Sequence, residues 1–232
     1  MAQRHPSSRR RGGESRGEEA EDVFVAKILE LSNWARANSL VLTLFGLALV
    51  LVVGGVLYYV NFSRSLENQA IAQLEQIHQT VQVGDPATAR AQLTQFLERF
   101  GGTPMAGEAR LALARLDLRE GQPDQAIQVL DRSDLSLDDP MGVQIENLKA
   151  KALEAAGRPR DAERAYLRVA DAAELDFQRV DALADAARLR SSQGNPAGAA
   201  QLYQRILDQL DPDSPDRGLY EMRLAEAHAT GG

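Results

Sequence analysis

The stretch Glu154–Tyr166, EAAGRPRDAERAY, decides the fold because it places a glycine, a proline two residues later and an alanine three residues beyond the proline. Glycine readily ends a helix in the left-handed conformation. Proline, with a preset backbone angle and no amide donor, favours the first turn of the next helix. Gly157 and Pro159 therefore predict a tight turn between two helices, with Ala162 on the second.

The same element occurs four times, at intervals of 37, 36 and 37 residues, starting at Gly84, Gly121, Gly157 and Gly194. Self-similarity with such a period is typical of solenoids. Mostly small residues stand seven positions before each glycine, and large ones nine positions after it: Ile77, Ala114, Ala150 and Ala187, then Leu93, Leu130, Tyr166 and Tyr203. Small residues let two helices approach closely and large ones fill the space between hairpins, so four packed helical hairpins are expected.

These positions resemble the tetratricopeptide repeat family over roughly residues 66–229. The resemblance departs from the family in its period, which is longer than the usual 34 residues, and in Ile77, where a small residue is expected. The second copy turns polar early at Ser133 and Asp134, so looser packing is expected around the loop 134–142. Residues 216–229 resemble the opening helix of a fifth unit and predict a capping helix, which solenoid ends need.

Ahead of the repeats, residues 39–60 (SLVLTLFGLALVLVVGGVLYYV) contain no charge. A helix of this length reaches about 33 Å, enough to cross a hydrocarbon layer of about 30 Å. A cleaved signal peptide is the alternative, but the run is long, begins late and ends without a small-x-small cleavage site. Trp34, Tyr58, Tyr59 and Phe62 flank it, as expected at membrane interfaces. The predicted fold class is thus all-α: one transmembrane helix, 39–60, then a tetratricopeptide-like solenoid, 61–232, with its capping helix.

The N-terminal 38 residues predict a cytoplasmic location for this end. Residues 1–21 are rich in Arg, Ser, Gly and Glu and predict a disordered tail. Residues 22–38 carry Phe24, Ile28, Leu31 and Trp34 at helical spacing, which predicts an amphipathic juxtamembrane helix. Seven Lys or Arg residues precede the apolar run and only Arg64 follows it within twenty residues. The positive-inside rule then places the N-terminus in the cytoplasm and the body in the periplasm or outside the cell.

Composition argues against several classes of function. The chain has no cysteine, and residues 61–232 hold 19 Lys and Arg against 27 Asp and Glu, which opposes binding to nucleic acid. The three histidines lie far apart, and no metal-ligand pair or phosphate loop is recognisable. We expect no catalytic residue, metal, cofactor or small-molecule substrate. We expect the partners to be proteins.

In a tetratricopeptide solenoid the first helix of each hairpin lines the concave face, so the resemblance implies a groove. Six residues before each glycine stand His78, Arg115, Lys151 and Arg188, with Arg119 and Asn147 close to the same line. We hypothesise that this row binds a carboxylate or an acidic, extended segment of a partner. The alternatives are coincidence, local pairing of Lys151 with Glu154 or Glu146, and a His78 without a special role.

The whole layout resembles the bacterial ancillary subunits of the SecYEG protein-export channel, the YfgM-like family. That resemblance implies a role beside the translocon, with translocon subunits, a membrane-tethered chaperone and exported chains as partners. The second hypothesis is a structural or assembly subunit of another membrane or cell-envelope complex, such as one for cell division. The two differ in the interface expected, since a permanent subunit should expose a broad apolar patch.

Overall fold

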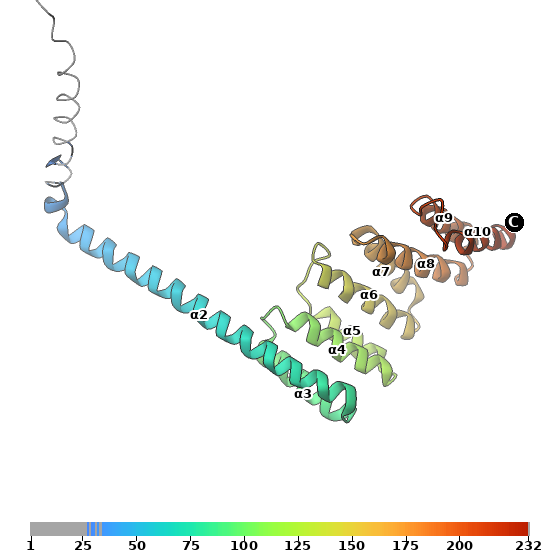
Figure 1. Cartoon of the computed structure of the whole chain (residues 1–232), viewed down its shortest axis with the longest axis horizontal. Helices are drawn as coiled ribbons and strands as arrows, with labels where there is room; N and C mark the ends of the chain where they lie inside the picture. Colours follow the sequence, from blue (N-terminus) through green and yellow to red (C-terminus); the bar gives the residue numbers. More distant parts are fainter. Residues whose placement is uncertain (1–26, 28, 31, 33, 232) are drawn as a thin grey trace, which may run out of the picture. The chain divides into compact units, whose positions relative to one another are not determined.

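The computed structural model describes residues 27–231 apart from 28, 31 and 33, and this part of the chain is helical without strands (Figure 1). The predicted tail 1–21 lies outside the described residues, as do Phe24, Ile28 and Leu31 of the predicted juxtamembrane helix. The helices are α2 (Ser39–Val83), α3 (Pro86–Phe100), α4 (Ala106–Arg119), α5 (Pro123–Asp131), α6 (Pro140–Ala155), α7 (Pro159–Ala172), α8 (Asp176–Ser192), α9 (Pro196–Leu207) and α10 (Arg217–Gly231).

Three of the four predicted glycine turns have the expected conformation. Gly121, Gly157 and Gly194 adopt φ angles of 71°, 72° and 79°. The amide after each glycine donates to a carbonyl five residues earlier, as in Arg158 N to Leu153 O at 2.9 Å. This bond satisfies a carbonyl at the end of the helix. A proline opens each following helix, so the prediction from the Gly-x-Pro element is confirmed there.

The first turn differs from the other three. Gly84 does not adopt a positive φ angle, so the expectation of a left-handed residue is wrong at this position. Its amide continues the helical pattern by donating to Thr80 O at 2.7 Å. Asp85 then takes the extended conformation, and its side chain accepts a hydrogen bond from Thr88 N at 3.0 Å. An aspartate cap therefore makes the turn, and Pro86 still opens α3.

The residues that repeat in size form the core. Ile77 is 3% exposed, and its small counterparts on α4, α6 and α8 are fully buried. The large residues on α3, α5, α7 and α9 are also buried, including Tyr166 at 1% exposure. One apolar cluster joins the last turns of α2 to α3 and α4, and a second extends from α4 to α10. The packing pattern predicted from side-chain size is confirmed.

The loop between α5 and α6 packs more tightly than expected. A Cβ atom on Gly142, in the first turn of α6, would lie 1.9 Å from Ser136 O. A Cβ atom on Gly107 of α4 would lie 2.8 Å from Met141 Cγ and 3.1 Å from Leu135 Cδ1. Within the loop, Ser136 Oγ accepts from Asp138 N, and Asp139 caps α6 by accepting from Met141 N at 2.7 Å. The expectation of looser packing is therefore wrong where this loop meets α4 and α6.

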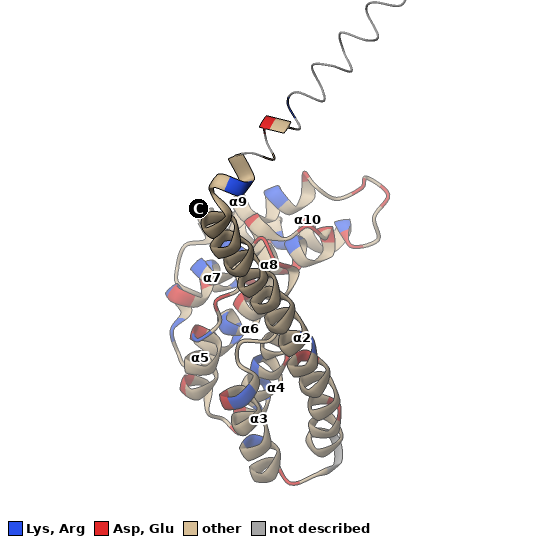
Figure 2. Ribbon diagram, turned by 90° about the vertical axis from the view of Figure 1, so that its left-hand side faces the viewer, with Lys and Arg blue, Asp and Glu red and all other residues tan. Residues whose placement is uncertain are grey.

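The chain divides into two compact units, residues 1–62 and 63–232, and α2 contributes to both. In the first unit, residues 39–60 of α2 form one helix without a charged side chain (Figure 2). The segment Ser39–Val81 is long and apolar enough to cross a membrane, and none of its apolar window is buried. The second unit contains the end of α2 and helices α3 to α10, in which each hairpin packs against the next.

Candidate functional site

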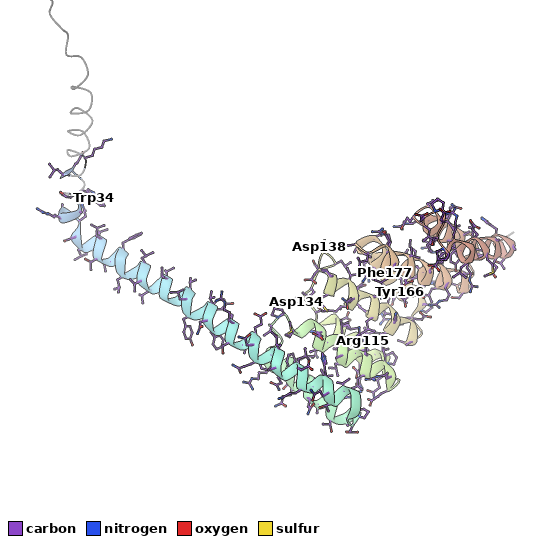
Figure 3. The ribbon with its side chains drawn as sticks, viewed as in Figure 1. Trp34, Arg115, Asp134, Asp138, Tyr166 and Phe177 are labelled. Carbon is purple, nitrogen blue, oxygen red and sulfur yellow. The ribbon has the colours of Figure 1, made fainter. Side chains whose placement is uncertain are left out.

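The first helices of the four hairpins each carry one of the predicted basic residues directly after a buried one. His78 follows Ile77 on α2, and the same arrangement recurs for Arg115 on α4, Lys151 on α6 and Arg188 on α8. Arg115, Lys151 and Arg188 are exposed and His78 is half-buried. Because the preceding residue is buried and the basic residues are at least partly exposed, the basic side chains point away from the core; Arg115 is labelled on α4 in Figure 3.

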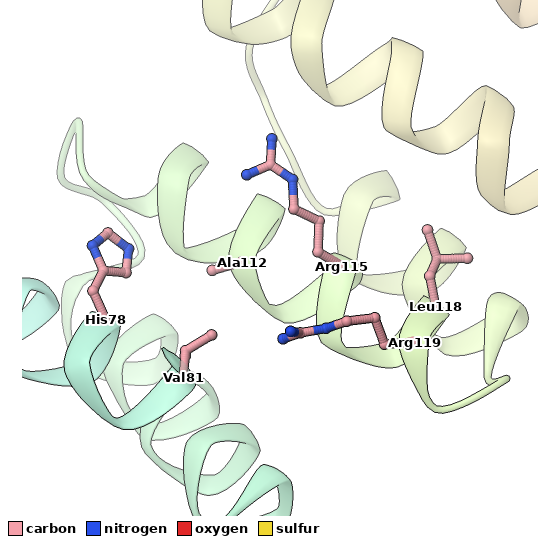
Figure 4. A pocket seen from close by; sticks show the side chains of 6 residues that line it. All are labelled: His78, Val81, Ala112, Arg115, Leu118 and Arg119. Atoms are coloured by element: carbon pink, nitrogen blue, oxygen red, sulfur yellow. The ribbon is translucent and has the colours of Figure 1, made fainter. Parts of the chain in front are cut away.

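A hollow of about 490 Å³ brings together three of the six predicted residues. His78 stands on one side, on α2, and Arg115 and Arg119 stand on α4 (Figure 4). The remaining lining consists of apolar side chains, Val81, Ala112 and Leu118. We call this hollow the α2/α4 groove. Two arginines one helical turn apart beside an apolar lining suit the groove to a ligand in which a carboxylate or another anionic group adjoins an apolar group.

The charges within the groove are only partly compensated. His78 Nε2 lies 3.6 Å from Glu108 Oε1, an ion pair that exists only when the histidine is protonated. Arg115 and Arg119 form no ion pair with any residue of the described structure. Both guanidinium groups therefore remain available to a carboxylate from outside.

Arg188, the counterpart of Arg115 on α8, is neutralised by its own chain. Its Nη1 donates to Glu154 Oε1 at 2.7 Å, and its Nη2 donates to Glu154 Oε2 and to Asp185 Oδ1, both at 2.9 Å. The hydrogen bond from Arg188 holds the pKa of Glu154 below its ordinary value, although partial burial opposes this. The same bond raises the pKa of Arg188 itself. The charge of Arg188 is therefore compensated within the chain, and its guanidinium group is less available to a partner.

The two predicted residues on α6 have surroundings that differ from those of both Arg115 and Arg188. Asn147 is half-buried and Lys151 is exposed. Lys151 does not pair with Glu154 or Glu146, since Glu154 binds Arg188 and Glu146 accepts from Arg168 Nε at 3.0 Å. It lies instead near Asp181, whose pKa is raised chiefly by burial and also by Asp185, whereas Lys151 lowers it.

The six predicted residues thus all lie on first helices of the hairpins and are at least partly exposed, but their electrostatic environments differ. The positive stretch is concentrated at the α2/α4 groove and declines toward α8, where carboxylates compensate it. Sequence reasoning missed the apolar lining. Its signal was present, because Ala112 and Leu118 stand three residues before and after Arg115 on the same helix face. That these predicted residues bind a protein stays a prediction.

A second network missed from the sequence joins α3 to α4. Asp117 of α4 is 1% exposed, and its Oδ1 lies 2.6 Å from Arg90 Nη1 of α3. The contact is an ion pair of imperfect geometry, because Oδ1 receives no well-directed hydrogen bond in the described structure. Burial raises the pKa of Asp117, and the charge of Arg90 opposes that rise. Arg90 also binds Glu120 and Gln125, so it joins the first two hairpins.

Comparison with known proteins agrees with this architecture. Two crystal structures of nearly identical TPR-like repeats, from a Podosopora anserina protein described as a kinesin light chain, superpose with a TM-score of 0.57 at 21% identity. The alignment covers 72% of this chain and 88% of theirs, and at this identity it shows the fold alone. No curated protein matches the sequence. The model of the tetratricopeptide repeat-like domain family matches residues 32–229, which include the apolar segment as well as the repeats. The chain therefore belongs to the tetratricopeptide repeat-like domain family.

Proposed function

We propose that this protein is a membrane-anchored adaptor whose α2/α4 groove binds an acidic segment of a partner protein. The observation that carries the proposal is the pair Arg115 and Arg119, which have no ion-pair partner in the described structure and border an apolar hollow. Tetratricopeptide folds typically serve as scaffolds for protein interaction, with extended concave binding surfaces.

The chemistry of the groove favours a particular kind of segment. Arginine can hold a carboxylate through two parallel hydrogen bonds, which gives direction as well as attraction. Val81, Ala112 and Leu118 offer apolar contact beside the arginines. A segment with Asp or Glu next to a large apolar side chain satisfies both features. The chain carries an overall charge of −7, so the groove is a local positive region on an otherwise acidic protein.

The proposal places the body on the extracytoplasmic side of a bacterial inner membrane. It rests on the uncharged helical segment 39–60 and on the excess of Lys and Arg before it. A tether of this kind confines the body near the membrane and raises its effective concentration toward a neighbouring complex to about millimolar, without tight contacts. Weak, reversible binding in the groove is then sufficient.

The resemblance to ancillary subunits of the SecYEG channel makes translocon subunits, a membrane-tethered chaperone and exported chains the proposed partners. A role in the transfer of newly exported chains agrees with an open groove that combines charge with apolar contact. A permanent structural subunit would be expected to use a broader apolar interface.

Charge reversal in the groove tests the binding proposal. The probe is a fluorescein-labelled peptide, GSEDLFDESG, added to the full chain in mild detergent and followed by fluorescence anisotropy. We expect the Arg115→Glu, Arg119→Glu variant to bind it at least about tenfold more weakly, because two attractive contacts become repulsive. Arg132→Glu with Arg160→Glu is the matched control, since both residues are exposed and neither forms an ion pair in the described structure. Equal weakening in the control would refute the groove.

Topology and partners require separate experiments. Because the chain has no cysteine, Ser8→Cys and Ser191→Cys can each be labelled with a membrane-impermeant maleimide in spheroplasts. The proposal expects labelling at position 191 alone. Mass spectrometry of proteins that accompany the full chain from mild detergent should recover export-channel components, less abundantly with the reversed groove. Recovery of an unrelated complex would replace the proposed partners.

A further inference from the structure

A second hollow lies at the edge of the body where α6 and α8 begin, apart from the α2/α4 groove. It measures about 470 Å³, within the range of about 300–1,000 Å³ that is usual for binding pockets. Its apolar lining includes Leu137, Val143 and Leu175, and its acidic lining consists of Asp138, Asp171 and Glu174. We call it the loop-edge hollow. Arg115 and Arg119 line only the other site, toward the opposite end of the first helices.

The charged side chains that line the loop-edge hollow are all acidic. The two loop segments that border it, 134–139 and 171–176, each contain three carboxylates and no Lys or Arg. Asp171 binds Arg205 and Asp176 binds Arg179, whereas the other four carboxylates form no ion pair in the described part of the chain. Two of these four, Asp138 and Glu174, line the hollow itself. The loop before α6, with Asp134 and Asp138, and the start of α8, with Phe177, are labelled in Figure 3.

Large apolar side chains remain exposed beside these carboxylates. Leu175, which lines the hollow, is 52% exposed, and Phe177, two residues further on, is 63% exposed. No group of three or more possible metal ligands occurs among the described residues. Apolar contact next to unpaired negative charge suits a polypeptide segment better than it suits an ion.

The hollow is held in shape before anything binds. Ser136 approaches Gly142 so closely that no side chain fits between the loop and α6, and Asp139 fixes the loop by capping that helix. On the other side, Arg179 Nη2 donates to Ala173 O at 2.7 Å and holds the α7–α8 connection. A preformed surface loses little conformational entropy on binding, which favours its use as a docking site.

We infer that the loop-edge hollow is a second docking surface, which takes a partner-protein segment with Lys or Arg side chains on either side of a large apolar residue. Its charge preference is opposite to that proposed for the α2/α4 groove, so one body holds two different segments at once. The chain's own basic cluster, Arg9–Arg11, does not fit this description. No Val, Leu, Ile, Met, Phe, Tyr or Trp occurs between residues 2 and 22, so that cluster lacks the apolar anchor.

The test uses the full chain in mild detergent and three fluorescein-labelled peptides: GSKRLFRKSG, its acidic counterpart GSEDLFDESG and the polar GSKRSSRKSG. We expect the basic-apolar peptide to bind at least about tenfold more tightly than either of the others, since the polar peptide has the same charge without the apolar contact and the acidic peptide is repelled by the carboxylates. Asp138→Lys with Glu174→Lys should remove the preference for the basic-apolar peptide over the acidic one. Leu175→Ser should reduce the preference over the polar peptide with little effect on folding, because Leu175 is half exposed.

Two controls keep the result specific. Glu98→Lys with Asp124→Lys changes the net charge equally on exposed positions of α3 and α5, and should leave the basic-apolar affinity unchanged. The groove variant Arg115→Glu, Arg119→Glu should also leave it unchanged, so this inference and the proposed function fail separately. No binding of the basic-apolar peptide at millimolar concentration, equal binding of the polar peptide, or equal loss in the charge-matched control would each overturn the second surface.

Discussion

Helices α4 and α8 present the same repeat position in opposite electrostatic states. Arg115 and Arg188 both stand six residues before a turn glycine, and both follow a fully buried alanine. Arg188 is bound by two carboxylates, whereas Arg115 forms no ion pair in the described structure. The repeat therefore fixes where a side chain points, and the neighbouring repeat positions decide whether its charge is available.

The neighbouring positions can be identified one by one. The partners of Arg188, Glu154 and Asp185, stand three and nine residues before the glycines of their repeats. The same positions around Arg115 hold Val81 and Ala112, which line the α2/α4 groove. The two carboxylates that neutralise one arginine thus correspond to two apolar residues that border the other. One substitution pattern accounts for both the charge and the apolar lining of the groove.

The largest expected effect concerns one ion pair on each of these two helices, in which one partner belongs to the neighbouring helix. Asp117 of α4 and Arg190 of α8 both stand four residues before a glycine, and they pair with Arg90 and Glu163 with the signs reversed. Asp117→Ala should lower the free energy of unfolding by about 2–3 kcal/mol, because it removes the buried carboxylate that compensates the charge of Arg90. Glu163→Ala should lower it by about 1 kcal/mol, because that pair is more exposed. Urea unfolding followed by far-UV circular dichroism measures both.

A matched substitution separates charge from packing at this position. The second and third repeats meet through Ile127 and Leu153, at the positions where the other two pairs of successive repeats carry ion pairs. Replacing a buried ion pair with apolar residues is often neutral or stabilising, so Arg90→Ile with Asp117→Leu should recover much of the loss in Asp117→Ala. A loss for Glu163→Ala as large as that for Asp117→Ala would contradict the importance given to burial.

Transferring the α8 carboxylates to the α2/α4 groove should remove its proposed activity. Val81→Glu with Ala112→Asp places acids where Glu154 and Asp185 stand, so Arg115 should become paired within the chain. We expect binding of GSEDLFDESG to weaken about tenfold or more, which corresponds to about 1.4 kcal/mol. Ala91→Asp with Gln95→Glu adds the same charge on exposed positions of α3 and should change the affinity much less. Equal weakening by both variants would mean that net charge, not the groove, determines binding.

The reverse transfer should create a site on α8 with a smaller effect. Glu154→Val with Asp185→Ala frees Arg188 and surrounds it with the apolar residues found near Arg115. Isothermal titration of the same acidic peptide should then show a second, weaker site of about millimolar affinity, since α8 lacks a counterpart to Arg119. An unchanged stoichiometry would show that removal of the carboxylates does not by itself make this position a binding site.

The sequence predicted the scaffold better than the site, for a physical reason. Gly157 and Pro159 act through their own backbones, and Ala150 and Tyr166 act through size, so a regular period was enough to predict turns and core. Ion pairs depend on which of several long side chains reaches a given carboxylate. The pairing of Arg188 with Glu154 spans 34 residues and could be found only by comparing repeats position by position. The Gly84 turn was missed because an aspartate cap can replace a left-handed glycine.

The smallest expected effect is a difference in pH dependence between the two arginines. Arg188 lowers the pKa of Glu154 from its ordinary value of 4.5, so its stabilisation is present above pH 4.5 and is lost as the pH falls through the lower folded value. Solvent screens this half-exposed pair, so Arg188→Gln should flatten the acid limb of the stability curve by at most about 1 kcal/mol. Arg115→Gln should leave the limb as it is, because Arg115 has no carboxylate partner in the described structure. Unfolding free energies measured between neutral pH and pH 3 compare the two variants directly. Equal flattening by both would show that Arg115 is paired in solution, and the distinction between α4 and α8 would fail.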